Sequence, residues 1–384
     1  MKTIFIIGML DSIHFARWLG QFKDQEYNFL IYPSKHFRRV HPQLESLLLD
    51  KNLKSKYQLV GGTSSIKFAG YYDYIFVEKI GLSARINFRA QKLAKLLEDK
   101  KPHYIHALEF QGAGYLLTQI HPKTLKASKV IATNWGSDIY YFKSFQIHLK
   151  VIEKVLKIAD YYSAECIRDY KLARKMGFEG VDLPCIPNAG GFDLRDVDMR
   201  FSLPSERTQI IIKGYGGLFG RADLPISLIP EVAQRFPKYS FFIYSVTPDS
   251  FDLIMNLSKS VRNRIRISRV GSGLTHEEMQ TEFRKSRLYI GCSESDGIST
   301  SFLESLVNGT YPIQTGTSCA NEWVQQGAHA SIVNLSPADI LKEIEFSLTN
   351  DEQVDSAAVG NLELAKAKLG KDYINQLANT YYLA

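Results

Sequence analysis

Short apolar runs alternate along the chain with longer stretches in which apolar residues recur every three or four positions. The main runs lie at residues 3–7, 29–32, 130–133, 209–213 and 288–291. The periodic stretches between them include residues 13–22, 167–176 and 276–284. A short continuous apolar run is typical of a strand buried on both faces of a parallel sheet, whereas the longer spacing is typical of an amphipathic helix. The alternation therefore predicts an α/β fold with parallel sheets.

The length of 384 residues is sufficient for two domains, each with its own core. A charged, proline-containing stretch at residues 194–208 separates two series of strand and helix patterns. We therefore expect a first domain of residues 1–193 and a second of residues 194–365, followed by a helical tail at residues 366–384.

The segment from Ser293 to Thr315 carries the most informative pattern. It follows the apolar run at residues 288–291, turns at Asp296-Gly297, and continues as a helix that Gly309 is suited to end. Residues 311–313 then begin another strand. In such a βαβ unit the turn and the first amides of the helix lie at the carboxyl end of the strands, where α/β sheets bind ligands.

Two carboxylates bracket this turn, Asp296 before it and Glu304 inside the helix. The small residues between them allow a phosphate to approach the backbone, and the carboxylates accept hydrogen bonds from ribose and hexose hydroxyls. This arrangement predicts a nucleotide-sugar site. Two structural alternatives stay open, since Ser301 and Glu304 have the spacing of a helix capping box and Asp296-Gly297 is an ordinary turn sequence.

The sequence DGISTSFLESLVNGTYPI resembles the motif of two acids separated by seven residues in retaining glycosyltransferases of family 4. Asp296 stands where the family usually has its first glutamate, and Ile298-Ser299 stands for Phe-Gly. The resemblance implies the GT-B architecture, two Rossmann-like domains facing an interdomain cleft, with the tail crossing back to the first domain. The expected donor-binding residues are Gly297, Ile298, Ser299, Thr300, Ser301 and Glu304, with Asp296 as a catalytic residue.

The glycine-rich stretch at residues 214–221, after the run at 209–213, lacks the G-x-G-x-x-G spacing of a dinucleotide site. The next strand, at residues 239–245, also ends without the acid that would bind a ribose of NAD. The stretch is similar instead to the family's GR-x-x-x-x-KG segment, whose cations face the donor diphosphate. This similarity implies Arg221 first and Lys213 second as catalytic cations, with a structural role for Lys213 left open.

Further segments resemble the acceptor side of the family. Residues 101–107 resemble the strand that ends at the cleft, and residues 134–139 resemble its hGSDi loop, in which Trp135 replaces the usual histidine. The acceptor-binding residues implied are His14, His106, Trp135 and Asp138. Capping of the following helix is an equal alternative for Asp138.

Composition narrows the class of protein. A hydrophobic content of 45% and a charged content of 23% are those of a globular protein, and the net charge of +7 favours anionic partners. Nucleic acid is not expected, because no nucleic-acid-binding motif is present. The four cysteines form no C-x-x-C pair, so we expect no metal site and no disulfide framework.

No apolar run approaches the length of a membrane span, and residues 1–10 fit a first strand better than a signal peptide. We therefore expect a cytoplasmic protein. The basic amphipathic helix at residues 85–97 leaves open whether it lies on anionic lipid at the inner face of the plasma membrane or has a solvated face.

Taken with the resemblance, these patterns predict a retaining, metal-independent glycosyltransferase without cofactor, using a nucleoside-diphosphate sugar. Its acceptor would be a glycan, a lipid-linked or another acceptor in cell-surface polysaccharide or glycoconjugate biosynthesis. The alternatives are a non-catalytic GT-B-like module that binds a nucleotide or glycan, and a nucleotide-sugar epimerase of the same architecture.

Overall fold

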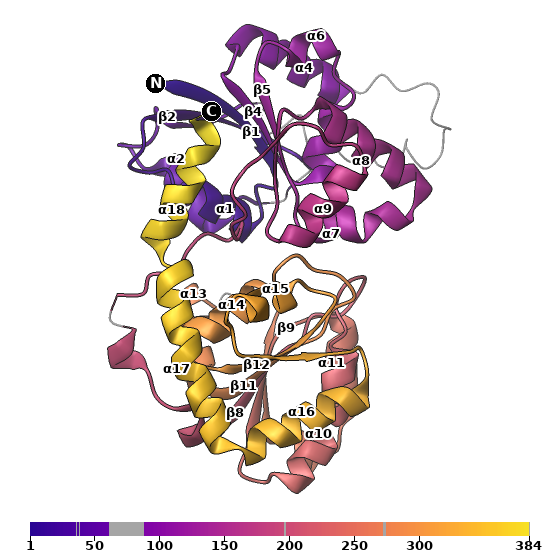
Figure 1. The fold of residues 1–384 in the computed structure, drawn as a ribbon, viewed down its shortest axis with the longest axis vertical. Coiled ribbons are helices and arrows are strands. Elements are labelled where there is room, and N and C mark those ends of the chain that lie inside the picture. The colour runs from indigo at the N-terminus through magenta and orange to yellow at the C-terminus, as the bar shows by residue number, and fades with distance from the viewer. Residues whose placement is uncertain (36, 38, 61–87, 196, 272–273, 384) are drawn as a thin grey trace. The chain divides into compact units, whose positions relative to one another are not determined.

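The computed structural model describes the whole chain except residues 36, 38, 61–87, 196, 272–273 and 384. The chain forms two compact units, Met1–Gly190 with Ile374–Ala384, and Gly191–Tyr373. Each is a parallel sheet with helices on both faces (Figure 1). The predicted class of two Rossmann-like α/β domains is therefore confirmed.

Within the described residues the first sheet has seven strands in the order β3-β2-β1-β4-β5-β6-β7, paired in parallel. Its strands are β1 (Lys2–Gly8), β2 (Tyr27–Pro33), β3 (Tyr57–Leu59), β4 (Tyr104–Leu108), β5 (Lys129–Thr133), β6 (Tyr161–Ser163) and β7 (Val181–Asp182). Its helices are α1 (Ile13–Gly20), α2 (Pro42–Leu49), α4 (Phe88–Lys100), α5 (Tyr115–Leu117), α6 (Pro122–Leu125), α7 (Ser137–Tyr140), α8 (Gln146–Ile158) and α9 (Ile167–Lys175).

The apolar run of β1 explains why this sheet is covered on both sides. Ile4 and Ile6 point into one hydrophobic cluster, whereas Phe5 and Ile7 point into another, and all four are fully buried. Successive side chains of a strand face opposite sides of the sheet, so an uninterrupted apolar run requires two apolar layers.

The last residues of the chain complete the first core. Helix α18 (Lys371–Asn379) lies against the first sheet in Figure 1, and the turn after it carries the fully buried Tyr381 and Tyr382. The Tyr381 ring lies 5.0 Å from that of Trp18, and the Tyr382 hydroxyl accepts a hydrogen bond from Trp18 Nε1 at 3.3 Å. The first domain therefore depends on residues from the far end of the sequence.

The second sheet, as far as the chain is described, has six parallel strands in the order β10-β9-β8-β11-β12-β13. Its strands are β8 (Gln209–Lys213), β9 (Ser240–Val246), β10 (Ile265–Arg269), β11 (Ser286–Gly291), β12 (Tyr311–Thr315) and β13 (Ser331–Val333). Its helices are α10 (Asp223–Arg235), α11 (Pro248–Met255), α12 (Lys259–Arg262), α13 (His276–Lys285), α14 (Thr300–Val307), α15 (Ala320–Gln325), α16 (Pro337–Thr349) and α17 (Asp351–Lys368). Because the strand order reverses between β8 and β11, the loops that follow these two strands flank a topological switch point, where such sheets bind ligands.

The basic helix expected at residues 85–97 is described only from Phe88, and residues 85–87 lie outside the described residues. In α4, Leu93 and Leu97 are buried, and Arg89 donates hydrogen bonds to the carbonyls of Pro33 and Ser34 at 2.8 and 2.9 Å. Arg89 is thus engaged with the backbone of its own domain. Among the described helices, none has both the length and the apolarity needed to cross a membrane.

Candidate functional site

The candidate site in the second domain is the turn between β11 and α14. Ser299 is the residue before the helix, and it makes no side-chain capping hydrogen bond. The first amides of a helix lack intrahelical acceptors and lie at the positive end of its dipole. The start of α14 therefore offers donors to an anion.

The capping-box alternative for this helix is wrong. The Ser301 hydroxyl accepts a hydrogen bond from the Tyr244 hydroxyl at 2.6 Å, and the Glu304 carboxylate accepts one from Gln280 Nε2 at 3.1 Å. The reciprocal pattern occurs instead at α13, where Thr275 and Glu278 form the box. Ser301 and Glu304 thus have partners on neighbouring elements.

Lys213, the last residue of β8, reaches this turn. Its Nζ lies 3.6 Å from Asp296 Oδ2 and 3.5 Å from Ser299 Oγ. The side chains of Lys213 and Asp296 are 26% and 30% exposed, so both remain accessible to a ligand. An ammonium and the amino end of a helix therefore lie together at the switch point, beside a carboxylate.

Arg221 has a different environment. Its guanidinium donates to both carboxylate oxygens of Asp223 at 2.9 and 3.0 Å and to Glu294 at 2.6 Å. These bonds, first those to Asp223 and then that to Glu294, raise the pKa of Arg221 further. Its backbone N–H also donates to the Cys292 carbonyl at 3.0 Å. Arg221 thus joins the glycine-rich loop to the turn after β11.

Glu304 is held in a buried polar network. Its side chain is 10% exposed, and one carboxylate oxygen lies 3.5 Å from His276 Nδ1. Gln280, its donor, accepts in turn from Asn308 Nδ2 at 2.6 Å. Sequence reasoning missed His276 and Gln280, because α13 is distant in sequence and only the packing of α13 beside α14 brings them to Glu304.

Two buried tyrosines support the start of α14 from the sheet. Besides the bond from Tyr244 to Ser301, the Tyr289 hydroxyl lies 3.4 Å from Ser299 Oγ. Burial raises the pKa of both tyrosines, so both hydroxyls keep their protons. In the sequence these residues looked like ordinary apolar strand positions, and nothing distinguished them.

In the first domain the structure brings together two of the four residues expected on the acceptor side. The rings of His14, at the start of α1, and Trp135, after β5, lie 5.7 Å apart in an edge-to-face contact. Both are partly buried and lie near the carboxyl end of the sheet. An indole with an adjacent imidazole can contact the face of a sugar ring and one of its hydroxyls.

Asp138 does not cap the helix that follows Trp135, because it lies inside α7, whose start has no side-chain capping hydrogen bond. One carboxylate oxygen accepts hydrogen bonds from the N–H groups of Trp135 and Phe110, each at 2.9 Å, and the residue is 7% exposed. Burial, and then the charge of Glu109, raise the pKa of Asp138. Asp138 therefore fixes the loop that carries Trp135.

The expectation that His106 contacts an acceptor is wrong. The residue is fully buried, and its two ring nitrogens lie 2.8 Å from the Tyr382 hydroxyl and 2.6 Å from the Thr133 hydroxyl. Burial lowers the pKa of His106 from 6.5 to about 3, so the ring is neutral. The position of His106 near the carboxyl end of its strand indicated that a substrate could reach it, but the C-terminal tyrosines cover its side chain.

Glu109 is a residue of this region that the sequence did not single out. It has φ of 113°, a conformation that side chains other than glycine rarely adopt, and it precedes a π-helical turn at Phe110–Gly114. Its carboxylate accepts from the N–H groups of Gly112 and Ala113, each at 2.7 Å. Burial raises the pKa of Glu109 despite these bonds. Strain of this kind is concentrated at functional sites.

Two parallel-sheet α/β domains, the second with a helix that starts beside the switch point of its sheet, are the architecture of the GT-B class. Similar solved structures agree with this assignment. HepE from Anabaena, solved with UDP, has a TM-score of 0.70 at 13% identity over 99% of each chain. Sucrose-phosphate synthase from Thermosynechococcus elongatus has a TM-score of 0.69 at 13% identity over 100% of this chain and 98% of that chain.

A putative UDP-N-acetylglucosamine 2-epimerase from Listeria monocytogenes has a TM-score of 0.61 at 12% identity, over 99% of this chain and 95% of that one. Residues 63–165 of the first domain match the family described as Glycosyl transferase 4-like. The resemblance to GT-B glycosyltransferases of the family-4 type is thus confirmed. No curated protein matches the chain.

Proposed function

We propose that the protein is a retaining glycosyltransferase that takes a sugar from a nucleoside-diphosphate sugar without a bound metal ion. The observation that carries the proposal is the position of Lys213 beside Asp296 and the start of α14. Negative charge accumulates on the departing diphosphate in the transition state, so a fixed ammonium and free amides there provide electrostatic catalysis.

The residues have separate roles in this proposal. Lys213 and the amides of Thr300 and Ser301 bind the diphosphate, and Glu304 accepts from the ribose hydroxyls. Asp296 and the backbone of 297–299 hold the transferred hexose. Arg221 acts mainly by fixing the glycine-rich loop, because its guanidinium is already bonded to Asp223 and Glu294.

The first domain provides the acceptor side in the same proposal. His14 and Trp135 contact the acceptor sugar, and Asp138 holds the loop of Trp135 in position. A glycan or lipid-linked acceptor, used at the cytoplasmic face in polysaccharide or glycoconjugate synthesis, fits this arrangement. The solved complexes of HepE with UDP and with UDP-glucose support a nucleotide sugar as the donor.

The experiment is a panel of nucleotide sugars tested first for stabilisation and then for transfer. At about 100-fold excess over the dissociation constant, the true donor stabilises the folded protein by about 2.7 kcal/mol. Incubation with candidate acceptors then yields a glycoside, and its anomeric configuration by NMR reports retention. Stabilisation without turnover identifies a binding module, and a changed sugar without glycoside identifies an epimerase. Either outcome overturns the proposal.

A further inference from the structure

The first domain contains a hollow of ≈ 850 Å³ that the proposed function does not use. Lys2, Tyr104 and Lys129 in its wall are the first residues of β1, β4 and β5, so it lies at the amino edge of the sheet. His14 and Trp135 lie near the opposite, carboxyl edge. A volume in the range of about 300–1,000 Å³ is typical of small-molecule sites.

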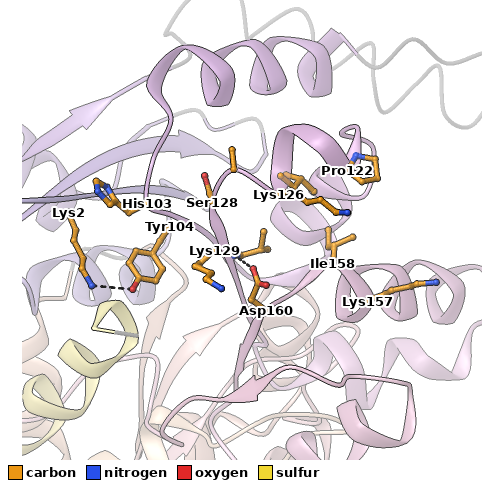
Figure 2. Close-up of a pocket in the computed structure, with 13 residues that line it drawn as sticks. Lys2, His103, Tyr104, Pro122, Lys126, Ser128, Lys129, Lys157, Ile158 and Asp160 are labelled. Atoms are coloured by element: carbon orange, nitrogen blue, oxygen red, sulfur yellow. Dashed lines mark hydrogen bonds between the residues drawn. The ribbon is translucent and has the colours of Figure 1, made fainter.

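Positive charge predominates in this hollow. Figure 2 shows Lys2 on one side, Lys129 in the middle, and Lys126 and Lys157 on the other side. Among the described residues of the wall the one carboxylate is that of Asp160, which accepts a hydrogen bond from the Val130 N–H at 2.8 Å. Four ammonium groups against one carboxylate create a positive potential that attracts an anion.

Three of these lysines have no acidic partner within the described residues. Lys126, Lys129 and Lys157 are exposed, and no carboxylate in the described part of the chain forms an ion pair with them. Lys2 is already engaged, because its Nζ donates to the Tyr382 carbonyl at 2.8 Å. The three lysines are therefore the groups that a ligand can neutralise.

The wall between the lysines is apolar. Pro122, Ala127 and Ile158 expose apolar surface in the wall, whereas Leu125 and Val130 are nearly buried. Inorganic phosphate alone leaves this surface uncovered, whereas a ligand with a hydrocarbon part gains free energy by burying it. The wall thus combines a cationic rim with an apolar floor.

We propose that the hollow at the amino edge of the first sheet binds a phosphate ester that carries an apolar chain. The phosphate lies among Lys126, Lys129 and Lys157, which bind it as point charges, and the chain lies on Pro122, Ala127 and Ile158. A membrane phospholipid and a free alkyl or prenyl phosphate share this chemistry. The site is independent of the transferase reaction proposed above.

The test compares two triple variants of the whole chain. K126E/K129E/K157E reverses the charge of the hollow, and K123E/K150E/K154E makes the same change at exposed lysines of α6 and α8 that do not line it. Binding of hexyl phosphate and of inorganic phosphate is measured by calorimetry. Sedimentation with phosphatidylcholine vesicles, with and without phosphatidic acid, is measured alongside.

The unchanged protein should bind hexyl phosphate at least about tenfold more tightly than inorganic phosphate. The affinity for hexyl phosphate should fall at least about tenfold in K126E/K129E/K157E and less than about threefold in the control variant. Sedimentation that requires phosphatidic acid and is lost in the hollow variant assigns a membrane lipid, whereas hexyl phosphate binding alone assigns a free ester. Equal losses in both variants, no preference for the hexyl group, or no binding of either probe overturns the proposal.

Discussion

Lys213 Nζ and Asp296 Oδ2 lie 3.6 Å apart, although 83 positions separate the two residues in the sequence. The sheet explains this proximity, because β8 and β11 are neighbours and Ile212 pairs with Ile290. Both strands end at the same edge, and the turns that follow bring the two side chains together. The pair therefore depends on strand order, and it offers a direct test of the proposed site.

Replacing Lys213 by Met should lower the turnover of donor by at least about 100-fold, since a fixed donor to the developing charge is removed. Arg221→Met should lower turnover less but decrease the melting temperature, because Arg221 joins two loops. Steady-state kinetics and thermal unfolding measure both, with the exposed Lys238→Met as the control. A larger loss of turnover in the Arg221 variant contradicts this order of importance.

Glu304→Gln should lower turnover by at least about tenfold, which corresponds to about 1.4 kcal/mol, because an amide is a weaker acceptor for ribose hydroxyls. Glu352→Gln, an exposed change on α17, is the matched control. Kinetics at several donor concentrations would show the loss. If the folded Glu304 variant kept the original turnover, Glu304 would have no role at the donor.

Acid should destabilise the first domain through His106. Its folded pKa of about 3 lies below the ordinary 6.5, so only the unfolded state gains a proton as the pH falls between these values. The stability contributed by the neutral ring is present above pH 6.5 and decreases by about 2 kcal/mol towards pH 4.5. Chemical denaturation of the original protein and of His106→Gln at several pH values measures this effect. The contributions of Glu109 and Asp138 are common to both proteins, so the difference between them reports on His106. Identical pH dependence in both proteins would refute it.

Tyr382→Ala should cost about 3–5 kcal/mol of stability, because a large ring is removed from a closely packed core. Tyr382→Phe should cost about 1–2 kcal/mol, since it removes only the hydroxyl bonded to Trp18 and His106. Denaturant unfolding of both variants separates packing from hydrogen bonding. Tyr373→Ala, an exposed change on α18, should be nearly neutral, and an equal effect there would argue against docking of the tail.

Gly220→Ala should disrupt the glycine-rich loop. A Cβ at this position would lie 1.8 Å from the Tyr215 carbonyl oxygen, so the backbone must move. Donor affinity and melting temperature should both fall. Gly20→Ala is the control, because a Cβ at residue 20 would have no neighbouring atom within 4 Å. A Gly220 variant with unchanged donor binding would show that the loop does not contribute to the site.

The sequence predicted the sheets well, because their strands are uninterrupted apolar runs. The run at residues 209–213 coincides with β8, and the helix after Asp296 begins at Thr300. A helical tail was expected at residues 366–384, and the structure divides this stretch at Leu369-Gly370 between α17 and α18. Periodicity identifies an element but gives little information on where it bends.

Apart from Lys213, His14 and Trp135, which the family resemblance implied, the candidate site was predictable only where its residues are close in sequence. Asp296, Ser299 and Glu304 lie within one βαβ unit, so their proximity follows from local geometry. The partners of Glu304 and the burial of His106 depend on which elements pack together, and spacing along the chain carries no such information. Similarly, Lys213 and Arg221 differ in their proposed roles because Arg221 is bonded to two carboxylates, those of Asp223 and Glu294, whereas Lys213 lies beside Asp296.

The insertion of Tyr381 and Tyr382 into the first core also affects synthesis of the protein. About 190 residues separate the end of the first domain's main segment from these tyrosines. At about 5–20 residues per second, the ribosome needs roughly 10–40 s to supply them. During that interval the nascent first domain exposes Trp18 and Phe22, which the tyrosines later cover, and chaperones that bind apolar surface have their best opportunity to act.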